Sequence, residues 1–182
     1  MLNFYLRLGK PLAFGVVLLF FSFAASATAF ACDAEALVKG IATTFERAAQ
    51  TQSPRAFSSA VAHYADMRSL AFFALGPYRS KLSPSDEYRY VTLARNFLGR
   101  WMAENSNRVS GSGISIQSCS SQIVTARYGN GTSVQFRLAS PRRVADISIS
   151  GISLAGVLRS KFTEVIRSNG GDVGALMDYL AR

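Results

Sequence analysis

The feature that most constrains the fold is a change of pattern in the middle of the chain. Residues 110–150 are rich in Ser, Gly, Val and Ile, and apolar and polar residues alternate there in short runs. The apolar members are Ile114 and Ile116, then Val134, Phe136 and Leu138, then Ile147 and Ile149. Strict alternation puts every second side chain on one face of a strand. With turn signals at Asn130-Gly131 and Ser140-Pro141, the pattern predicts an antiparallel four-stranded sheet with one apolar face.

Helical patterns flank this region on both sides. Before it, apolar residues recur at helical spacing in 33–50, after Ser53-Pro54, in Met67–Leu75 and after Ser83-Pro84, each with a capping or stop signal. After it, the same spacing returns in 154–168 and 172–180. Strands enclosed by helices predict a single α+β domain in which helices cover the apolar face of the sheet.

The first 31 residues have the order of a secretory signal peptide. Arg7 and Lys10 precede Leu12–Phe23, an apolar run of 12 residues, whereas spanning a bilayer takes about 20. Small residues follow and place the cleavage site after Ala31; cleavage at an earlier alanine and retention as an anchor are the alternatives. The sequence therefore predicts a signal peptide over 1–31 and one domain over 32–182.

The charge of the chain limits its partners. The whole chain carries a net charge of +9, and residues 1–31 contain two cations and no acid, so the mature chain keeps 18 cations against 11 acids. An exported basic protein is not expected to meet nucleic acid. Its anionic partners would be phospholipid headgroups or a membrane surface.

The two cysteines leave three possibilities open. Cys32 would be the first mature residue, and Cys119 is the only other cysteine. A Cys32–Cys119 disulfide is compatible with export and would contribute about 3–5 kcal/mol of stability in the chain-entropy model. Lipidation of Cys32, or a free thiol, are the alternatives.

The sequence contains no arrangement of residues typical of a catalytic or metal site. One histidine, His63, excludes sites that need two imidazoles, and the eleven acids are scattered without a recurring spacing. Gly111-Ser112-Gly113 precedes a predicted strand, so we interpret it as a turn rather than a phosphate loop. We therefore expect no catalytic residue, no metal ligand and no cofactor, and we predict that the protein is not an enzyme.

Aromatic residues are in surplus on the predicted helices. Ten of them lie between Phe45 and Trp101. Most must build the core between helices and sheet, but one covered face offers limited area to so many rings. The alternative is that some of them line a cavity for an apolar ligand between the layers.

Two segments carry motifs that point to a known family. Leu75–Ser83 contains a Leu-Gly-x-Tyr motif and is followed by the aromatic-rich helix Pro84–Met102. Val144–Leu154 contains an Asp followed by a Gly-hydrophobic-Ser entry into the next helix. These segments resemble the Leu-Gly-x-Tyr region and the last strand of the MlaC, or toluene-tolerance, family. The order of elements agrees from about Asp33 to Leu180.

The resemblance implies a periplasmic phospholipid carrier. Its expected partners are a phospholipid with buried acyl tails, an inner-membrane ABC-type lipid transporter complex and an outer-membrane lipid-transfer complex. The protein would shuttle lipid between the two membranes, as a monomer, and maintain the asymmetry of the outer membrane. The alternatives are a periplasmic adaptor that binds no lipid and a hopanoid-associated lipid-binding protein.

The expected lipid-binding residues lie on the apolar face of the sheet and on the facing helices. From the strands we expect Val134, Phe136, Leu138, Ile147 and Ile149 to line the cavity, with Leu70, Phe73, Phe97 and Trp101 opposite them. Arg142, Arg143, Arg159 and Lys161 are candidate docking charges.

Overall fold

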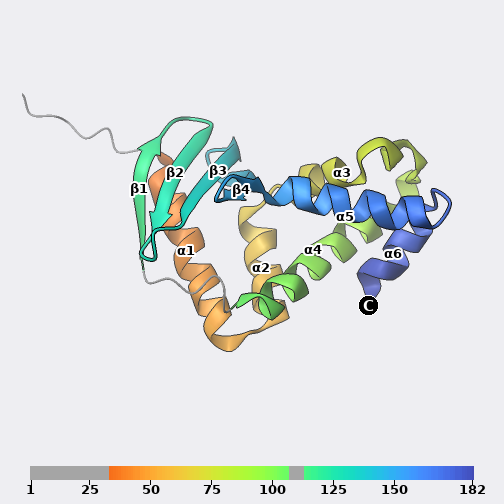
Figure 1. Ribbon diagram of the computed structural model, residues 1–182, viewed down its shortest axis with the longest axis horizontal. Coiled ribbons are helices and arrows are strands. Elements are labelled where there is room, and N and C mark those ends of the chain that lie inside the picture. Colours follow the sequence, from red (N-terminus) through yellow and green to blue (C-terminus); the bar gives the residue numbers. More distant parts are fainter. Residues whose placement is uncertain (1–32, 107–112) are drawn as a thin grey trace, which may run out of the picture. The chain divides into compact units, whose positions relative to one another are not determined.

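A computed structural model describes residues 33–106 and 113–182. Contacts divide the chain into Met1–Phe30 and Ala31–Arg182, and all described residues belong to the second unit (Figure 1). The helices are α1 (Asp33–Thr51), α2 (Pro54–Tyr64), α3 (Met67–Leu75), α4 (Glu87–Glu104), α5 (Leu154–Ser168) and α6 (Val173–Ala181); short 3₁₀ helices η1 (Gly76–Lys81) and η2 (Pro84–Asp86) lie between α3 and α4. The predicted signal peptide, and Cys32 of the predicted disulfide, lie outside the described residues.

The strands form one antiparallel sheet in the order β1-β2-β3-β4-β5. They are β1 (Ile114–Cys119), β2 (Ile123–Tyr128), β3 (Ser133–Ser140), β4 (Arg143–Ile149) and β5 (Ile152–Ser153). The α+β class is confirmed, but the expectation of four strands was wrong, because the described sheet has five. Ser150 (φ +50°) and Gly151 (φ +83°) form a two-residue turn of the kind that joins adjacent strands. This turn returns the chain along β4 for two more pairs, Ile149 with Ile152 and Ser148 with Ser153, before α5 begins.

One face of the sheet is buried and the other is exposed. On β2 and β3, Val124 lies opposite Phe136 and Ala126 opposite Val134, and all four side chains are buried. The residues between them, such as Gln135 and Arg137, are largely exposed. A register shift between β3 and β4 pairs Leu138 with Val144, which brings Val144 into the buried layer. The predicted alternation thus places a continuous apolar face on three strands.

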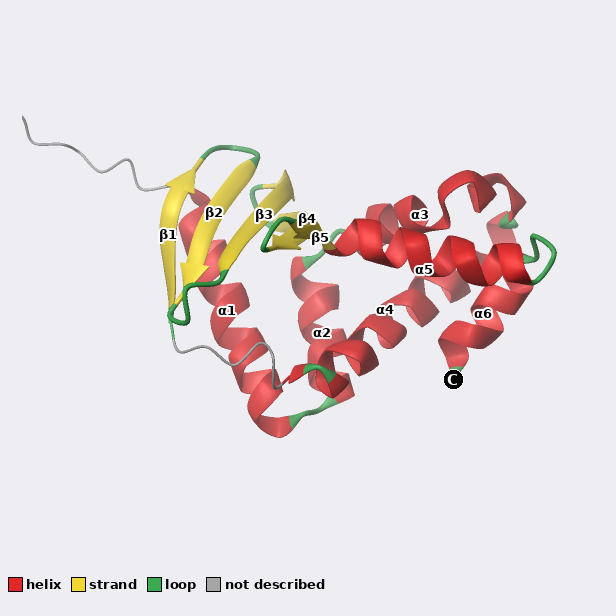
Figure 2. Cartoon of the chain, viewed as in Figure 1, coloured by secondary structure: helices red, strands yellow, loops and turns green. Residues whose placement is uncertain are grey.

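Helices from the first half of the chain cover this face. α1 packs against β1 and β2, while α2 and α3 reach β4; Figure 2 shows α1 along the sheet. The linker between α2 and α3 is tied to β4, since the N–H of Asp66 donates to the carbonyl of Val144 at 2.8 Å. The Arg143 guanidinium adds hydrogen bonds to the carbonyls of Ala62 and Ala65. None of the described helices is long and apolar enough to cross a membrane.

The remaining helices pack on one another. α3 packs against α5, and α6 against α4 and α5. Tyr90 on α4 is fully buried, and its hydroxyl donates to the carbonyl of Ala71 on α3 at 2.7 Å. Burial raises the pKa of Tyr90 far above its ordinary value, so the hydroxyl stays protonated and keeps this bond at every physiological pH.

Helices α2 and α4 cross closely at Gly99. A Cβ placed on Gly99 would contact Ser58 Oγ and would lie 2.7 Å from the carbonyl oxygen of Pro54. Helices approach this closely only where a residue without a side chain leaves room. Gly99 therefore sets the separation of the two helices that carry much of the site described below.

We predict that Gly99→Ala lowers the free energy of unfolding by about 1–3 kcal/mol, because the new methyl group overpacks the crossing. Urea denaturation of both proteins measures the change. The matched control is Gly156→Ala on α5, where a Cβ would lie 3.4 Å from Ser153 Oγ. That control should be neutral or stabilising by up to about 1 kcal/mol. Equal stability of Gly99→Ala and the wild type would contradict the close crossing.

Candidate functional site

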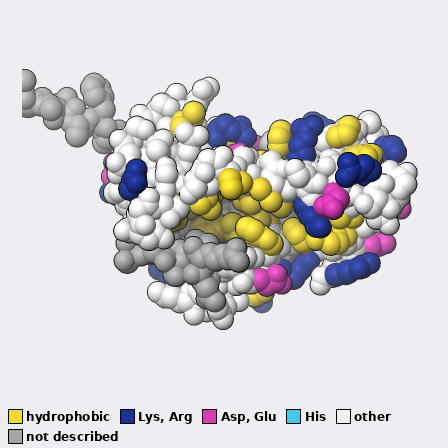
Figure 3. Space-filling view, viewed as in Figure 1, with side chains coloured by type: hydrophobic (Ala, Val, Ile, Leu, Met, Phe, Trp, Pro, Cys, Tyr) yellow, Lys and Arg dark blue, Asp and Glu magenta, His cyan; other side chains and the backbone are white. Residues whose placement is uncertain are grey.

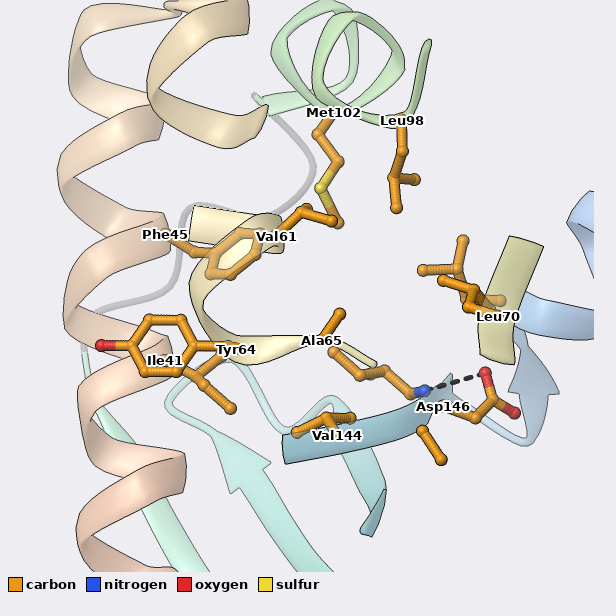
Figure 4. A pocket seen from close by; sticks show the side chains of 13 residues that line it. Ile41, Phe45, Val61, Tyr64, Ala65, Leu70, Leu98, Met102, Val144 and Asp146 are labelled. Atoms are coloured by element: carbon orange, nitrogen blue, oxygen red, sulfur yellow. Dashed lines mark hydrogen bonds between the residues drawn. The ribbon is translucent and has the colours of Figure 1, made fainter. Parts of the chain in front are cut away.

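An apolar pocket lies where the first four helices meet β4 (Figure 4). α1 and α2 contribute one wall, α3 and α4 the next, and β4 with the start of α5 closes the pocket. The lining residues are Ile41, Phe45, Val61, Tyr64, Ala65, Leu70, Leu98, Met102, Val144, Ala145, Asp146, Ile147 and Leu154. The pocket therefore lies between the helical layer and the buried face of the sheet.

Tyr64 contributes an apolar ring to the pocket while its polar group is used elsewhere. Its hydroxyl lies 3.1 Å from Thr44 Oγ1 on α1, and Thr44 donates in turn to the carbonyl of Gly40 at 2.8 Å. In Figure 4 the hydroxyl points away from the other lining side chains. A buried polar group that is hydrogen-bonded costs little, so the ring can face the pocket without exposing its oxygen to it.

Asp146 is the one ionisable side chain of the lining apart from Tyr64, and its carboxylate organises the backbone. Oδ1 accepts hydrogen bonds from the N–H groups of Ile147 and Ala155, each at 2.9 Å. Oδ2 accepts from Ser153 Oγ at 2.6 Å, and Ser153 Oγ accepts from the N–H of Gly156 at 3.0 Å. The carboxylate thus lies at the positive end of α5, where a negative charge is favourable. The spacing of Asp and Ser in the recognised motif is explained by this junction of β4, β5 and α5.

The pocket is narrow. Its volume is about 30 Å³, whereas pockets that enclose drug-sized ligands measure about 300–1,000 Å³. Figure 3 shows hydrophobic side chains gathered in a hollow on the face between the strands and the helices. Because the volume of the pocket is small, a large apolar ligand can enter only if the lining side chains and helices move apart.

The structure divides the predicted lipid-binding residues into three groups. Leu70 and Ile147 line the pocket. Val134 and Phe136 are buried in the core, with Leu138 packed against it; Phe97 packs instead against Phe162 and Tyr179, at 5.7 Å between ring centroids in each case. Phe73, Trp101 and Ile149 are 46%, 41% and 47% exposed.

Several lining residues were missed as site residues although their elements were correctly assigned. Ile41 and Phe45 on α1, and Leu98 and Met102 on α4, belong to apolar stripes with helical spacing. That spacing indicates which side of a helix is buried. It does not indicate which turn of the helix faces the pocket, because this depends on how the helices cross.

The described residues include no group of three or more His, Cys, Asp or Glu side chains placed to hold a metal ion. His63 is exposed at the end of α2 and contacts the ring of Tyr64 edge-on, with 4.6 Å between centroids. The Asp146 carboxylate is occupied by backbone and hydroxyl donors. The described lining is thus apolar apart from Tyr64 and Asp146, whose polar groups are hydrogen-bonded within the protein.

The fold and the pocket together define a class of α+β domain in which an apolar pocket lies between one sheet face and a layer of helices. The family model described as MlaC protein matches residues 35–182, and the chain belongs to this family. A search of the curated proteins gives no match.

A solved structure shares this fold. It is the phospholipid-binding protein from Ralstonia solanacearum in complex with a phospholipid, with 22% sequence identity and a TM-score of 0.66. The similarity covers 82% of the present chain and 95% of the other.

We predict that Asp146→Ala lowers the free energy of unfolding by about 2–4 kcal/mol, because three donors lose a charged acceptor. Thermal or urea denaturation measures the loss. Asp178→Ala removes an exposed carboxylate from α6 and should change the stability by less than about 0.5 kcal/mol. Similar losses in the two variants would show that Asp146 does not organise the junction.

Proposed function

We propose that the protein binds a phospholipid and holds its acyl tails in the pocket between the helices and β4. The observation that carries the proposal is the nearly all-apolar lining of this pocket in a member of the MlaC family. The Ralstonia protein of the same fold was solved with a phospholipid bound, which supports the same class of ligand. The alternatives are a hopanoid or related lipid, and an adaptor that binds no lipid.

The energetics of tail transfer favour such a lining. Keeping two acyl chains of about 30 methylenes from water is worth roughly 24 kcal/mol at about 0.8 kcal/mol per methylene, and a bilayer already provides this stabilisation. A carrier therefore needs a pocket about as apolar as the bilayer, so that lipid is both accepted and released. Side chains such as Leu70, Leu98 and Met102 provide this environment, and the flexible Met102 adapts to different tails.

Lipid uptake requires the pocket to open. Because its volume is about 30 Å³, the tails must displace the side chains that meet at its centre. The Asp146 junction is hydrogen-bonded to β4 and α5, so we expect it to stay in place. Movement is then expected in the helical wall, where Phe45, Val61 and Met102 are held by apolar contacts alone.

Membership in the MlaC family supports a proposal for the wider role of the protein. We propose that residues 1–31 direct the chain to the periplasm and are removed there. The mature protein would carry phospholipid between the outer-membrane lipid-transfer complex and the inner-membrane ABC transporter, as a monomer, and would help to maintain outer-membrane lipid asymmetry. No catalytic step belongs to this role.

Native mass spectrometry of the protein, purified from a periplasm without detergent, tests the proposal. A stoichiometric adduct with the mass of a phospholipid, identified after extraction, is the expected result. An adduct of hopanoid mass would support the first alternative. An unmodified mass that persists after incubation with liposomes would contradict lipid binding and favour the adaptor.

We predict that Met102→Gln lowers phospholipid occupancy roughly tenfold, because an amide without a partner in the pocket costs about 1–3 kcal/mol. Adduct intensity after incubation with a fixed amount of phospholipid measures the change. The control is Met67→Gln: Met67 is similarly half-buried but lies outside the pocket lining. If both variants keep wild-type occupancy, the tails do not lie against Met102.

A further inference from the structure

The side of the α2–α4 pair turned away from the pocket carries a groove to which the proposed function assigns no role. Two adjoining hollows of about 460 and 360 Å³ lie along it, and Ala62 and Arg95 line both of them. We call this surface the basic groove and define it by Arg55, Ser58, Arg95, Asn96, Arg100 and Arg143. The pocket-lining residues Val61, Leu98 and Met102 lie on the other side of the same two helices.

None of the described carboxylates forms an ion pair with the four guanidinium groups of the basic groove. The ion pairs found among the described residues lie elsewhere, at Lys39–Glu35, Arg68–Glu87 and Lys161–Glu164. Arg100 donates to the carbonyl of Leu180, Arg143 to the carbonyls of Ala62 and Ala65, and Arg95 to Asn96 Oδ1. These neutral acceptors position the arginines but leave their charges uncompensated.

Among the residues that line the two hollows, one is acidic: Asp66, in the second hollow. Its Oδ1 accepts a hydrogen bond from the N–H of Ser69 at 3.1 Å and caps α3. The basic groove therefore keeps a net positive charge and is suited to an anionic partner.

The donors in the basic groove suit phosphate. A guanidinium presents a planar fork that binds phosphate oxygens through two hydrogen bonds, and Ser58 and Asn96 add a hydroxyl and an amide beside it. Tyr88, which lines the second hollow, is 83% exposed. Tyrosine is one of the residues enriched at the headgroup level of membranes, where its ring and hydroxyl suit the interface.

The spread of the charges favours a surface over a single small anion. Arg55 lies in the first turn of α2, and Arg143 contacts the carbonyls near its end. α2 has 11 residues and is about 16 Å long at about 1.5 Å per residue. One phosphate cannot contact both ends, whereas the headgroups of a bilayer can.

We propose that the basic groove docks the protein on the surface of a bilayer that contains anionic phospholipids. The inference rests on the proposed function, because a lipid carrier must approach the membranes that it serves. Membrane docking gives a role to the charged side chains of α2 and α4, which take no part in acyl-tail binding.

Sedimentation with lipid vesicles tests the proposal. At low salt the wild-type protein should bind vesicles of phosphatidylcholine mixed with phosphatidylglycerol and should not bind vesicles of phosphatidylcholine alone. Arg55→Gln/Arg95→Gln should weaken binding to the mixed vesicles roughly 30-fold, since each surface cation contributes about a factor of five. Among the described residues, the side chains that donate to backbone carbonyls from the groove are those of Arg100 and Arg143. The Arg55→Gln/Arg95→Gln variant should therefore keep its fold, which thermal denaturation checks.

The matched control is Arg47→Gln/Arg137→Gln, which removes the same charge from exposed positions on α1 and β3. This variant should bind the mixed vesicles nearly as well as the wild type. Equal losses in the two variants would assign binding to net charge and overturn the proposal. No binding by the wild type would also overturn it, and would assign the groove to an acidic protein partner. The lipid adduct seen by native mass spectrometry is measured separately, so failure of docking is distinguishable from failure of the carrier proposal.

Discussion

The hydrogen bonds of the Asp146 carboxylate join the sheet to the helices beside the pocket. Its two oxygens accept from the N–H groups of Ile147 and Ala155 and from the Ser153 hydroxyl, so one side chain connects β4 with the start of α5. Ser153 extends this network, because its hydroxyl also caps the N-terminus of α5. Because α5 packs against α3 and α6, the positions of these three helices relative to the sheet depend on this junction. The closed end of the pocket is therefore fixed by directional bonds, while its helical wall is held by apolar contacts that can rearrange.

The α2–α4 pair separates two chemically different surfaces. Toward the sheet it presents Val61, Leu98 and Met102 to the pocket, and toward the outside it presents the basic groove. The close crossing at Gly99 holds the two helices together between these surfaces. In the proposed carrier role, the apolar site would match the interior of a bilayer and the basic groove would contact its surface. Opposite faces of the same two helices would then make these two contacts.

The class of the fold was predictable because its patterns are local. Alternation at Val134 and Phe136, and the caps at Ser53 and Ser83, depend only on neighbouring residues, and the structure shows these strand faces and caps. The fifth strand was not predictable, because Ser150 adopts a positive φ that serine rarely takes. The candidate site was predictable only in part. Leu70 and Ile147 line the pocket, but Trp101 and Phe73 are exposed, since an apolar stripe is longer than the part of it that another element covers. Which turn of each stripe meets the pocket is decided by contacts between residues far apart in the chain.

Photo-crosslinking with a phospholipid that carries a photoreactive group at the end of an acyl tail tests the central claim most directly. If the tails lie in the pocket, peptide mapping of the irradiated complex will find the label on Phe45, Leu98, Met102 or Ile147, which line it. A label confined to the exposed face of the sheet, at residues such as Gln135 and Arg137, would contradict tail binding between the helices and β4.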